Sequence, residues 1–173
     1  MLKKISIILL NFIKSSTKKE FFEIFCVPVL ITIVLYLFFD SKICNFTDFA
    51  NDFNNTVISI SSLLSAFGLA AVSILITSSS ENINKADKEY TGRYDRNKKP
   101  VSYYRLQIYR SFFSLIIQVI LLGISIIFKF YLKISFGIKI LFYLEVVILL
   151  IAIFSQILTI LSMYYLFVTI KDK

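Results

Sequence analysis

The chain has no histidine, no tryptophan and only two cysteines and two prolines among its 173 residues. Without imidazole side chains it lacks the usual general base, the Cys-His nucleophile pair and the commonest transition-metal ligand. Cys26 and Cys44 flank a predicted helix of about 27 Å, which is too long for a disulfide within one chain. The sequence also contains no phosphate-binding loop, zinc spacing or Ser-His-Asp set. We therefore expect a protein that is not an enzyme and that holds no cofactor and no metal.

Four long apolar runs dominate the sequence instead. Apolar residues make up 57% of the chain and the mean hydropathy is +0.77, above the roughly 45–50% apolar share of soluble domains. Each run is long enough to cross a hydrocarbon core of about 30 Å as a helix. The predicted spans are residues 21–39, 55–77, 111–132 and 136–170. The sequence predicts an all-α, polytopic integral membrane protein with a transmembrane domain over residues 21–173.

The basic residues are unevenly distributed between these spans. The net charge is +8, from 19 Lys and Arg against 11 Asp and Glu. Fifteen of the basic residues fall in segment 1–20, loop 78–110 and the C-terminal tail, and four fall in the two other loops. By the positive-inside rule, both termini and loop 78–110 are cytoplasmic. We expect a bacterial inner-membrane protein, and the charge does not imply direct nucleic-acid binding.

Segment 1–20 combines a basic face with an apolar one. As a helix, its polar face would carry Lys3, Lys4, Asn11, Lys14 and Ser15. This pattern predicts an amphipathic helix that lies in the interface of the lipid bilayer beside anionic headgroups. A frayed basic tail that only sets the topology is the alternative.

The span 55–77 is uncharged and richer in small residues than the other spans. These small residues include Ser62, Ser65, Ala66, Gly68, Ala70 and Ser73. Small side chains let helix backbones approach closely. This contact is important in lipid, because burial of apolar surface does not drive helix association there. We predict that this span is the central packing helix and that it supports self-association.

Three polar residues stand inside predicted spans, where a polar group is a functional candidate because it is costly in lipid. Gln118 and Gln156 are predicted to lie at the same depth on antiparallel helices and to hydrogen-bond, which usually serves helix packing. Glu145 is interpreted as a carboxylate near the outer interface that reaches the headgroups or pairs with Lys139.

The cytoplasmic side is basic and aromatic. The capping-box spacing of Ser78 and Glu81 predicts a short helix through Tyr90, after which Gly92 and Pro100 predict irregular structure. The last span is about 35 residues, or about 50 Å, so its end projects from the membrane. Candidate partner-binding residues on this side are Arg93, Arg96, Lys98, Lys99, Tyr103, Tyr104, Arg105, Tyr164, Tyr165 and Phe167. Tyrosine and arginine are frequent at interface hot spots. They also form ordinary interfacial belts, which is the alternative.

These features together resemble a known family. The second span reads F-x-x-A-x-x-S-I-L from Phe67 to Leu75, and it accompanies four spans, a basic loop and an overlong last helix. In this combination the chain is similar to the membrane component of the Kiwa antiphage system. The resemblance implies a homo-oligomer, with a tetramer favoured, that holds a cytosolic DNA-binding defence protein at the inner membrane and senses phage attack.

From the residues themselves, three functions stay open. The first is a membrane scaffold or sensor subunit that recruits a cytosolic partner protein. The second is a pore-forming effector or small channel that depolarises the cell, and the third is a bacteriocin-immunity-like protein or small transporter.

Overall fold

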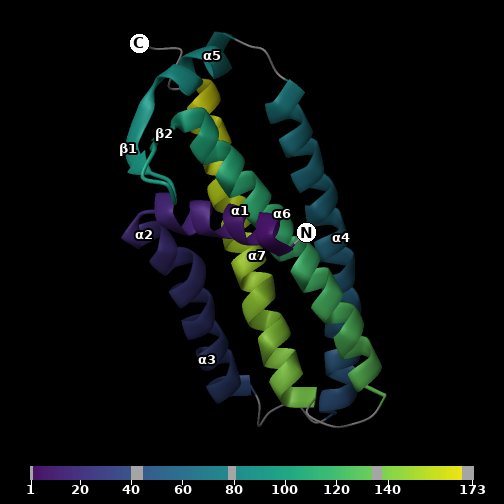
Figure 1. The fold of residues 1–173 in the computed structure, drawn as a ribbon. Helices are drawn as coiled ribbons and strands as arrows, with labels where there is room; N and C mark the ends of the chain where they lie inside the picture. The colour runs from purple at the N-terminus through teal and green to yellow at the C-terminus, as the bar shows by residue number, and fades with distance from the viewer. Residues whose placement is uncertain (1, 40–44, 78–80, 134–137, 169–173) are drawn as a thin grey trace.

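Three long helices run side by side along the molecule in this computed structural model (Figure 1). They are α4 (Phe46–Thr77), α6 (Tyr103–Tyr131) and α7 (Ile138–Val168). The structure describes residues 2–39, 45–77, 81–133 and 138–168, so Cys44 lies outside the described residues. We call the end of the bundle that carries residues 81–102 the hairpin end, and the opposite end the far end.

A fourth apolar segment packs against α7 on the side away from α4 (Figure 1). It consists of α2 (Lys18–Phe21), a π-helical turn (Phe22–Cys26) and α3 (Val27–Phe39). The π turn comes directly before Pro28, whose missing N–H and bulky ring disturb the regular helical hydrogen bonds. Thr32 adds a hydrogen bond in the next turn, since its hydroxyl donates to the Pro28 carbonyl at 2.9 Å.

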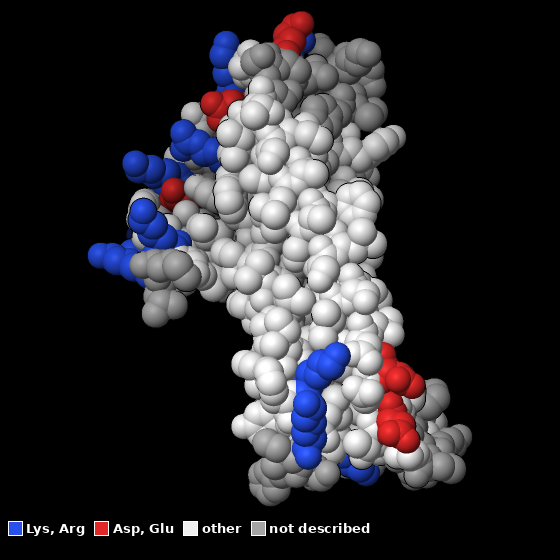
Figure 2. Space-filling model, turned by 90° about the vertical axis from the view of Figure 1, so that its right-hand side faces the viewer, with Lys and Arg blue, Asp and Glu red and all other residues white. Residues whose placement is uncertain are grey.

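The described residues contain four helical segments that are long and apolar enough to cross a membrane. They are Lys18–Phe38, Phe46–Thr77, Tyr103–Tyr131 and Ile138–Tyr165. On the face drawn in Figure 2, charged side chains lie toward the ends and one edge, and the broad middle is uncharged. The predicted number of long apolar helices, four, is thus confirmed for the described part of the chain.

Two of the helices are longer than the spans that we predicted within them. Helix α4 begins about nine residues before residue 55, and α6 begins about eight residues before residue 111. At the far end, Phe46 and Phe53 each contact the ring of Phe142, which extends α4 beyond its apolar run. At the start of α6, the Ser102 hydroxyl accepts from the Arg105 amide at 3.3 Å and caps the helix. Hydropathy detects neither contact, because both depend on packing or capping.

The predicted segment 1–20 is divided into two helices. Helix α1 (Leu2–Ser15) crosses the bundle in front of α6 (Figure 1). Thr17 and Glu20 form a capping box that starts α2. The exposed side chains of α1 include Lys3, Lys4 and Lys14, whereas Phe12 is buried.

The region between α4 and α6 contains α5 (Glu81–Lys88), where we predicted a short helix. Around Gly92 and Pro100, where we predicted irregular structure, an antiparallel hairpin of β1 (Tyr90–Tyr94) and β2 (Pro100–Ser102) forms instead, so the fold is not strictly all-α. Asp95 organises the turn, because its Oδ1 accepts from the amides of Asn97 and Lys99 at 2.8 and 2.9 Å. Gly92 has a φ of 71° and lies at the irregularity in the strand pairing.

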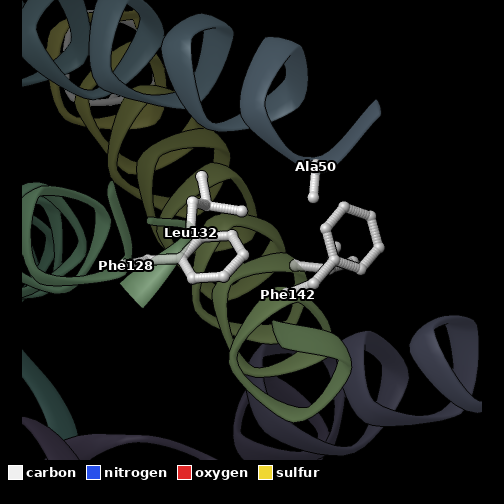
Figure 3. Packing of buried hydrophobic residues seen from close by; sticks show 5 residues of the cluster. Ala50, Phe128, Leu132 and Phe142 are labelled. Atoms are coloured by element: carbon white, nitrogen blue, oxygen red, sulfur yellow. The ribbon is translucent and has the colours of Figure 1, made fainter. Parts of the chain in front are cut away.

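The far end of the bundle is closed by an apolar cluster. Ala50 faces the ring of Phe142, and Phe128 lies beside Leu132 (Figure 3). All four side chains are buried, and they join α4, α6 and α7. Side-chain packing of this kind holds helices together in lipid.

Candidate functional site: a polar seam and a charged latch

Polar side chains fill much of the interior between α4, α6 and α7. On α6 they follow the spacing of a packing stripe, at every third or fourth residue. The buried residues of this stripe are Gln107, Ser111, Ser114, Gln118, Leu121, Ser125 and Phe128. Facing polar groups are supplied by Asn54 and Ser61 of α4 and by Glu145, Ser155, Gln156 and Thr159 of α7. We call the polar members of this set the polar seam.

The middle of the polar seam is a network of amides and hydroxyls. Gln118 Nε2 donates to Gln156 Oε1 at 2.9 Å, so the predicted pairing of these residues is confirmed. The same amide contacts Ser114 Oγ at 3.1 Å, and the Ser114 hydroxyl donates to Gln156 Oε1 at 2.8 Å. Toward the hairpin end, Gln107 Nε2 donates to the Thr159 carbonyl at 3.1 Å. The network ties α6 to α7 along several turns.

An apolar layer interrupts the polar seam toward the far end. The layer consists of Val57, Leu121, Leu149 and Ala152, all of them buried. On each of the three helices it separates the amide network from one further polar residue. Those residues are Asn54 on α4, Ser125 on α6 and Glu145 on α7.

The sequence-based interpretation of Glu145 is wrong. The residue is 0% exposed, so its carboxylate does not reach the headgroups from the bundle. Asn54 Nδ2 donates to Glu145 Oε1 at 2.8 Å and to the Ser125 carbonyl at 2.9 Å. Lys139 lies instead over the ring of Phe46, with its Nζ 5.5 Å from the ring centroid. The error arose because the hydropathy pattern gives depth but not the direction in which a side chain points.

A charged cluster fixes the hairpin to the helices. Arg93 of β1 and Arg110 of α6 both donate to the carboxylate of Glu20, at 2.8 and 2.5 Å. Arg93 Nη1 also donates to the Ser15 carbonyl at the end of α1, at 3.1 Å, and Arg110 donates to Ser162 of α7. We call Glu20, Arg93 and Arg110 the latch, because these residues join α1, α2, β1, α6 and α7.

The latch changes the role that we predicted for Arg93. We expected a partner-binding side chain, but its guanidinium is engaged by Glu20 and Ser15. Tyr104 is also turned inward, because its hydroxyl donates to the Leu75 carbonyl at 3.1 Å. Both side chains thus stabilise the hairpin end through contacts within the chain.

The other predicted partner-binding residues whose side chains are described lie on the surface. Exposed members are Arg96, Lys98, Lys99, Tyr103, Arg105, Tyr164 and Tyr165. Tyr164 and Tyr165 are 59% and 62% exposed, although both are large aromatic residues. The side chain of Phe167 lies outside the described part of the chain. We call the seven exposed residues the hairpin-end surface.

The small residues of α4 divide between two faces. Gly68 is buried against α6, where an added Cβ would lie 3.1 Å from both Leu115 and Gln118. The Ser65 hydroxyl is also buried. The other members point away from the bundle of one chain; they are Ser62, Ala66, Ala70 and Ser73. The hydroxyls of Ser62 and Ser73 donate to carbonyls of their own helix.

Sequence reasoning missed Asn54, Ser125, Glu20 and Arg110. Asn54 was assigned to an outer loop, and Ser125 was one of several serines without a distinctive pattern. Glu20 with Thr17 had the spacing of a capping box, which was the available signal for that residue. The positions of their partners required the tertiary structure.

The polar seam consists of amides, hydroxyls and one carboxyl, that of Glu145. Among the described residues, no group of three or more His, Cys, Asp or Glu side chains is arranged to hold a metal ion. The comparisons with known proteins give no family: no family model matches the sequence, and neither a curated protein nor a solved structure matches it.

Proposed function

We propose that this protein is the membrane-embedded subunit of an oligomeric assembly that recruits a soluble partner protein to the cytoplasmic face of a bacterial inner membrane. The observation that carries the proposal is that α6 and α7 continue well past the level of α1. Along this extension they present exposed aromatic and apolar side chains beside the basic hairpin.

The level of α1 on the bundle is set by ring stacking. The rings of Phe12 and Phe113 are parallel with centroids 3.8 Å apart, so α1 crosses α6 at Phe113. From there to Tyr131, α6 continues for about 18 residues, or about 27 Å, close to the thickness of a hydrocarbon core of about 30 Å. In the other direction it continues for about 10 residues, or about 15 Å, to Tyr103.

The side chains of α1 support its placement at the headgroup level. Lys3, Lys4 and Lys14 are exposed, and Leu10 and Ile13 remain 41% exposed beside them. A helix that combines exposed basic and apolar side chains is typical of the membrane interface. With α1 in that plane and the basic segments on the inner side, the hairpin end projects into the cytoplasm.

The projecting end carries apolar surface that lipid does not reach in this arrangement. On α7 it includes Ile160, Leu161, Tyr164 and Tyr165, each at least half exposed. Burial of apolar area contributes about 25 cal/mol per Å², so a protein partner that covers this surface gains substantial binding energy. Arg96, Lys98 and Lys99 on the neighbouring hairpin favour a partner with an acidic rim.

Oligomerisation is supported by the outward face of α4. Ser62, Ala66 and Ala70 are exposed at intervals of four residues, next to exposed Leu63 and Phe67. This face permits close contact with a helix of a second copy. Native mass spectrometry of the protein in detergent tests this part, and a strictly monomeric protein would contradict it.

A role in phage defence rests on the resemblance to the Kiwa membrane component. It is tested by phage plating on cells that express the chain with its neighbouring genes. Equal plating with and without the chain argues against defence, while leaving recruitment of another partner to be judged by co-purification.

The co-purification experiment compares two tyrosine variants. The double variant Tyr164→Ala/Tyr165→Ala removes the exposed rings at the hairpin end, and Tyr131→Ala removes a 41% exposed ring at the far end. We expect the double variant to recover at least about tenfold less of one defined soluble protein, since aromatic hot spots contribute about 2 kcal/mol or more. The Tyr131→Ala variant should recover as much as the unchanged protein. Equal recovery by all three proteins would refute the proposal.

The polar seam supports a second candidate function, a pore or small channel. It brings many more polar groups into the interior than the sequence suggested, but the apolar layer of Val57, Leu121, Leu149 and Ala152 interrupts them within one chain. A pore function predicts that overexpression alone collapses the membrane potential, as read with a potential-sensitive dye. A normal potential excludes it.

A further inference from the structure

The strongest unassigned feature is the polar group enclosed beyond the apolar layer. Asn54, Ser125 and Glu145 come from three different helices, and all three are 0% exposed. Asn54 connects the other two, since its amide donates one hydrogen to Glu145 Oε1 and the other to the Ser125 carbonyl. The three residues thus form one compact cluster inside the bundle.

Three atoms of this cluster are buried without a hydrogen bond of good geometry among the described residues, although the Ser125 side chain lies close enough to interact with the Glu145 carboxyl. They are Asn54 Oδ1, Ser125 Oγ and Glu145 Oε2. When the carboxylate is ionised, Asn54 Oδ1 and Glu145 Oε2 are both acceptors and neither is a donor. The Ser125 hydroxyl supplies a single hydrogen. The ionised cluster therefore has one donor too few. An ionised carboxylate in this position would also be a buried charge, which is strongly unfavourable in a membrane bundle.

We infer that Glu145 is a proton-binding site, with one proton from solution bound at Oε2 when α4, α6 and α7 are packed together. The protonated carboxyl then supplies the missing donor. Its O–H donates to Ser125 Oγ or Asn54 Oδ1, and the Ser125 hydroxyl is able to donate to the remaining acceptor. A proton satisfies all three atoms and needs no cavity.

Among the residues that the structure describes, the charged and titratable groups of the packed elements do not neutralise Glu145. Lys129 of α6 is exposed and donates to Asn55 at 2.8 Å, and Lys139 of α7 lies over Phe46. The remaining titratable groups described at this end are Tyr36 of α3, Asp48 and Asp52 of α4, Tyr131 of α6, Lys133 in the turn after α6 and Tyr143 of α7. Both aspartates are exposed, and the rings of Tyr36 and Tyr143 contact each other. Protonation is thus the simplest way to neutralise the buried carboxyl.

Proton binding couples the packing of the three helices to pH. A carboxyl that is neutral in the folded bundle and ionises more readily when the helices separate stabilises the bundle at low pH. This contribution is lost as the pH rises through the titration of the folded state. The bundle would therefore loosen when the proton leaves. Helix packing at the far end of the molecule would thus depend on the pH.

Infrared spectroscopy of the full-length protein in lipid tests the proposal directly. At neutral pH we expect a carbonyl band of a protonated carboxylic acid that Glu145→Gln abolishes. The matched variant Glu23→Gln, at a partly exposed carboxylate paired with Lys19, should leave the band unchanged. Isotope labelling of glutamate should shift the band, which assigns it to a glutamate rather than an aspartate even if Glu145→Gln fails to fold. Absence of the band in the unchanged protein at neutral pH would overturn the proposal.

Thermal melting provides the second measurement and distinguishes a proton from a metal cation. The melting temperature of the unchanged protein should fall with rising pH, more steeply than that of Glu145→Gln. Sodium chloride should stabilise the unchanged protein no more than the chloride of a large organic cation at the same ionic strength. Stabilisation by sodium that requires Glu145 would overturn the proposal, because the ligand would then be a metal ion.

Discussion

The close contact between α4 and α6 at Gly68 leads to a sharp prediction. Replacing Gly68 with alanine places a Cβ 3.1 Å from Leu115 Cδ2 and 3.1 Å from Gln118 Oε1. Neither neighbour is able to move easily. Leu115 is buried, and Gln118 is fully buried and hydrogen-bonded to Ser114 and Gln156. The substitution should therefore push α4 away from α6.

Gly123 provides a matched control for this change. It lies in α6, is exposed, and an added Cβ would meet nothing within 4 Å. Gly123→Ala should therefore show only the gain in helix propensity, about 0.5–1 kcal/mol of stability. Gly68→Ala makes the same gain but adds an overpacking cost of about 1–3 kcal/mol. The free energies of unfolding of the two variants should differ by about 1–3 kcal/mol.

Circular dichroism during heating in detergent measures this difference. For a chain of this size, 1 kcal/mol corresponds to about 2–4 °C in melting temperature, so Gly68→Ala should melt at least about 2 °C below Gly123→Ala. Equal melting temperatures would show that the helices are not in close contact at Gly68. A Gly68→Ala variant more stable than Gly123→Ala would refute the reasoning outright.

Two further predictions concern the hairpin end. Glu20→Gln removes the acceptor shared by the two arginines of the latch and should destabilise the hairpin by about 3 kcal/mol. Hydrogen exchange over residues 90–102 should then accelerate, whereas Glu23→Gln, at the exposed pair with Lys19, should change it little. Phe12→Ala removes a 1% exposed ring that stacks on α6. This substitution should weaken the packing of α1 on the bundle by about 3 kcal/mol or more. Exchange of the α1 amides should rise sharply in this variant, and Leu10→Ala, at a 41% exposed position, should leave it nearly unchanged.

These two predictions have clear contrary outcomes. Unchanged exchange at the hairpin in Glu20→Gln would mean that the strand pairing holds the hairpin without the latch. For α1, equal exchange in the Phe12 and Leu10 variants would mean that ring stacking does not fix the helix on the bundle.

Part of the candidate site was accessible from the sequence. Gln118 and Gln156 were paired correctly because antiparallel spans place residues at matching depths, and two amides in an apolar setting form a hydrogen bond. The exposed tyrosines of α7 were also anticipated from the length of the last apolar run. The side chain of Glu145 was predicted to point toward the headgroups, but it points into the bundle. The position of a residue along an apolar run does not determine the direction of its side chain.

The four long helices were determined by the sequence itself. In an apolar run, each helix satisfies its backbone hydrogen bonds locally, so length and hydropathy suffice to find it. The face that each helix turns inward was decided only in the tertiary structure. From Val57 to Thr77 all faces of α4 are apolar or small, and packing selected the edge of Val57, Ser61 and Gly68 over that of Ser62 and Ala66.

The polar interior and the hairpin were likewise decided by contacts distant in sequence. Asn54 meets Glu145 across 91 positions, and Glu20 meets Arg93 across 73. Lipid offers no difference in hydrophobicity between the inside and the outside of a bundle, so the local pattern carries little information about orientation. Hydrogen bonding and close packing between helices supply that information, and they exist only once the helices have assembled.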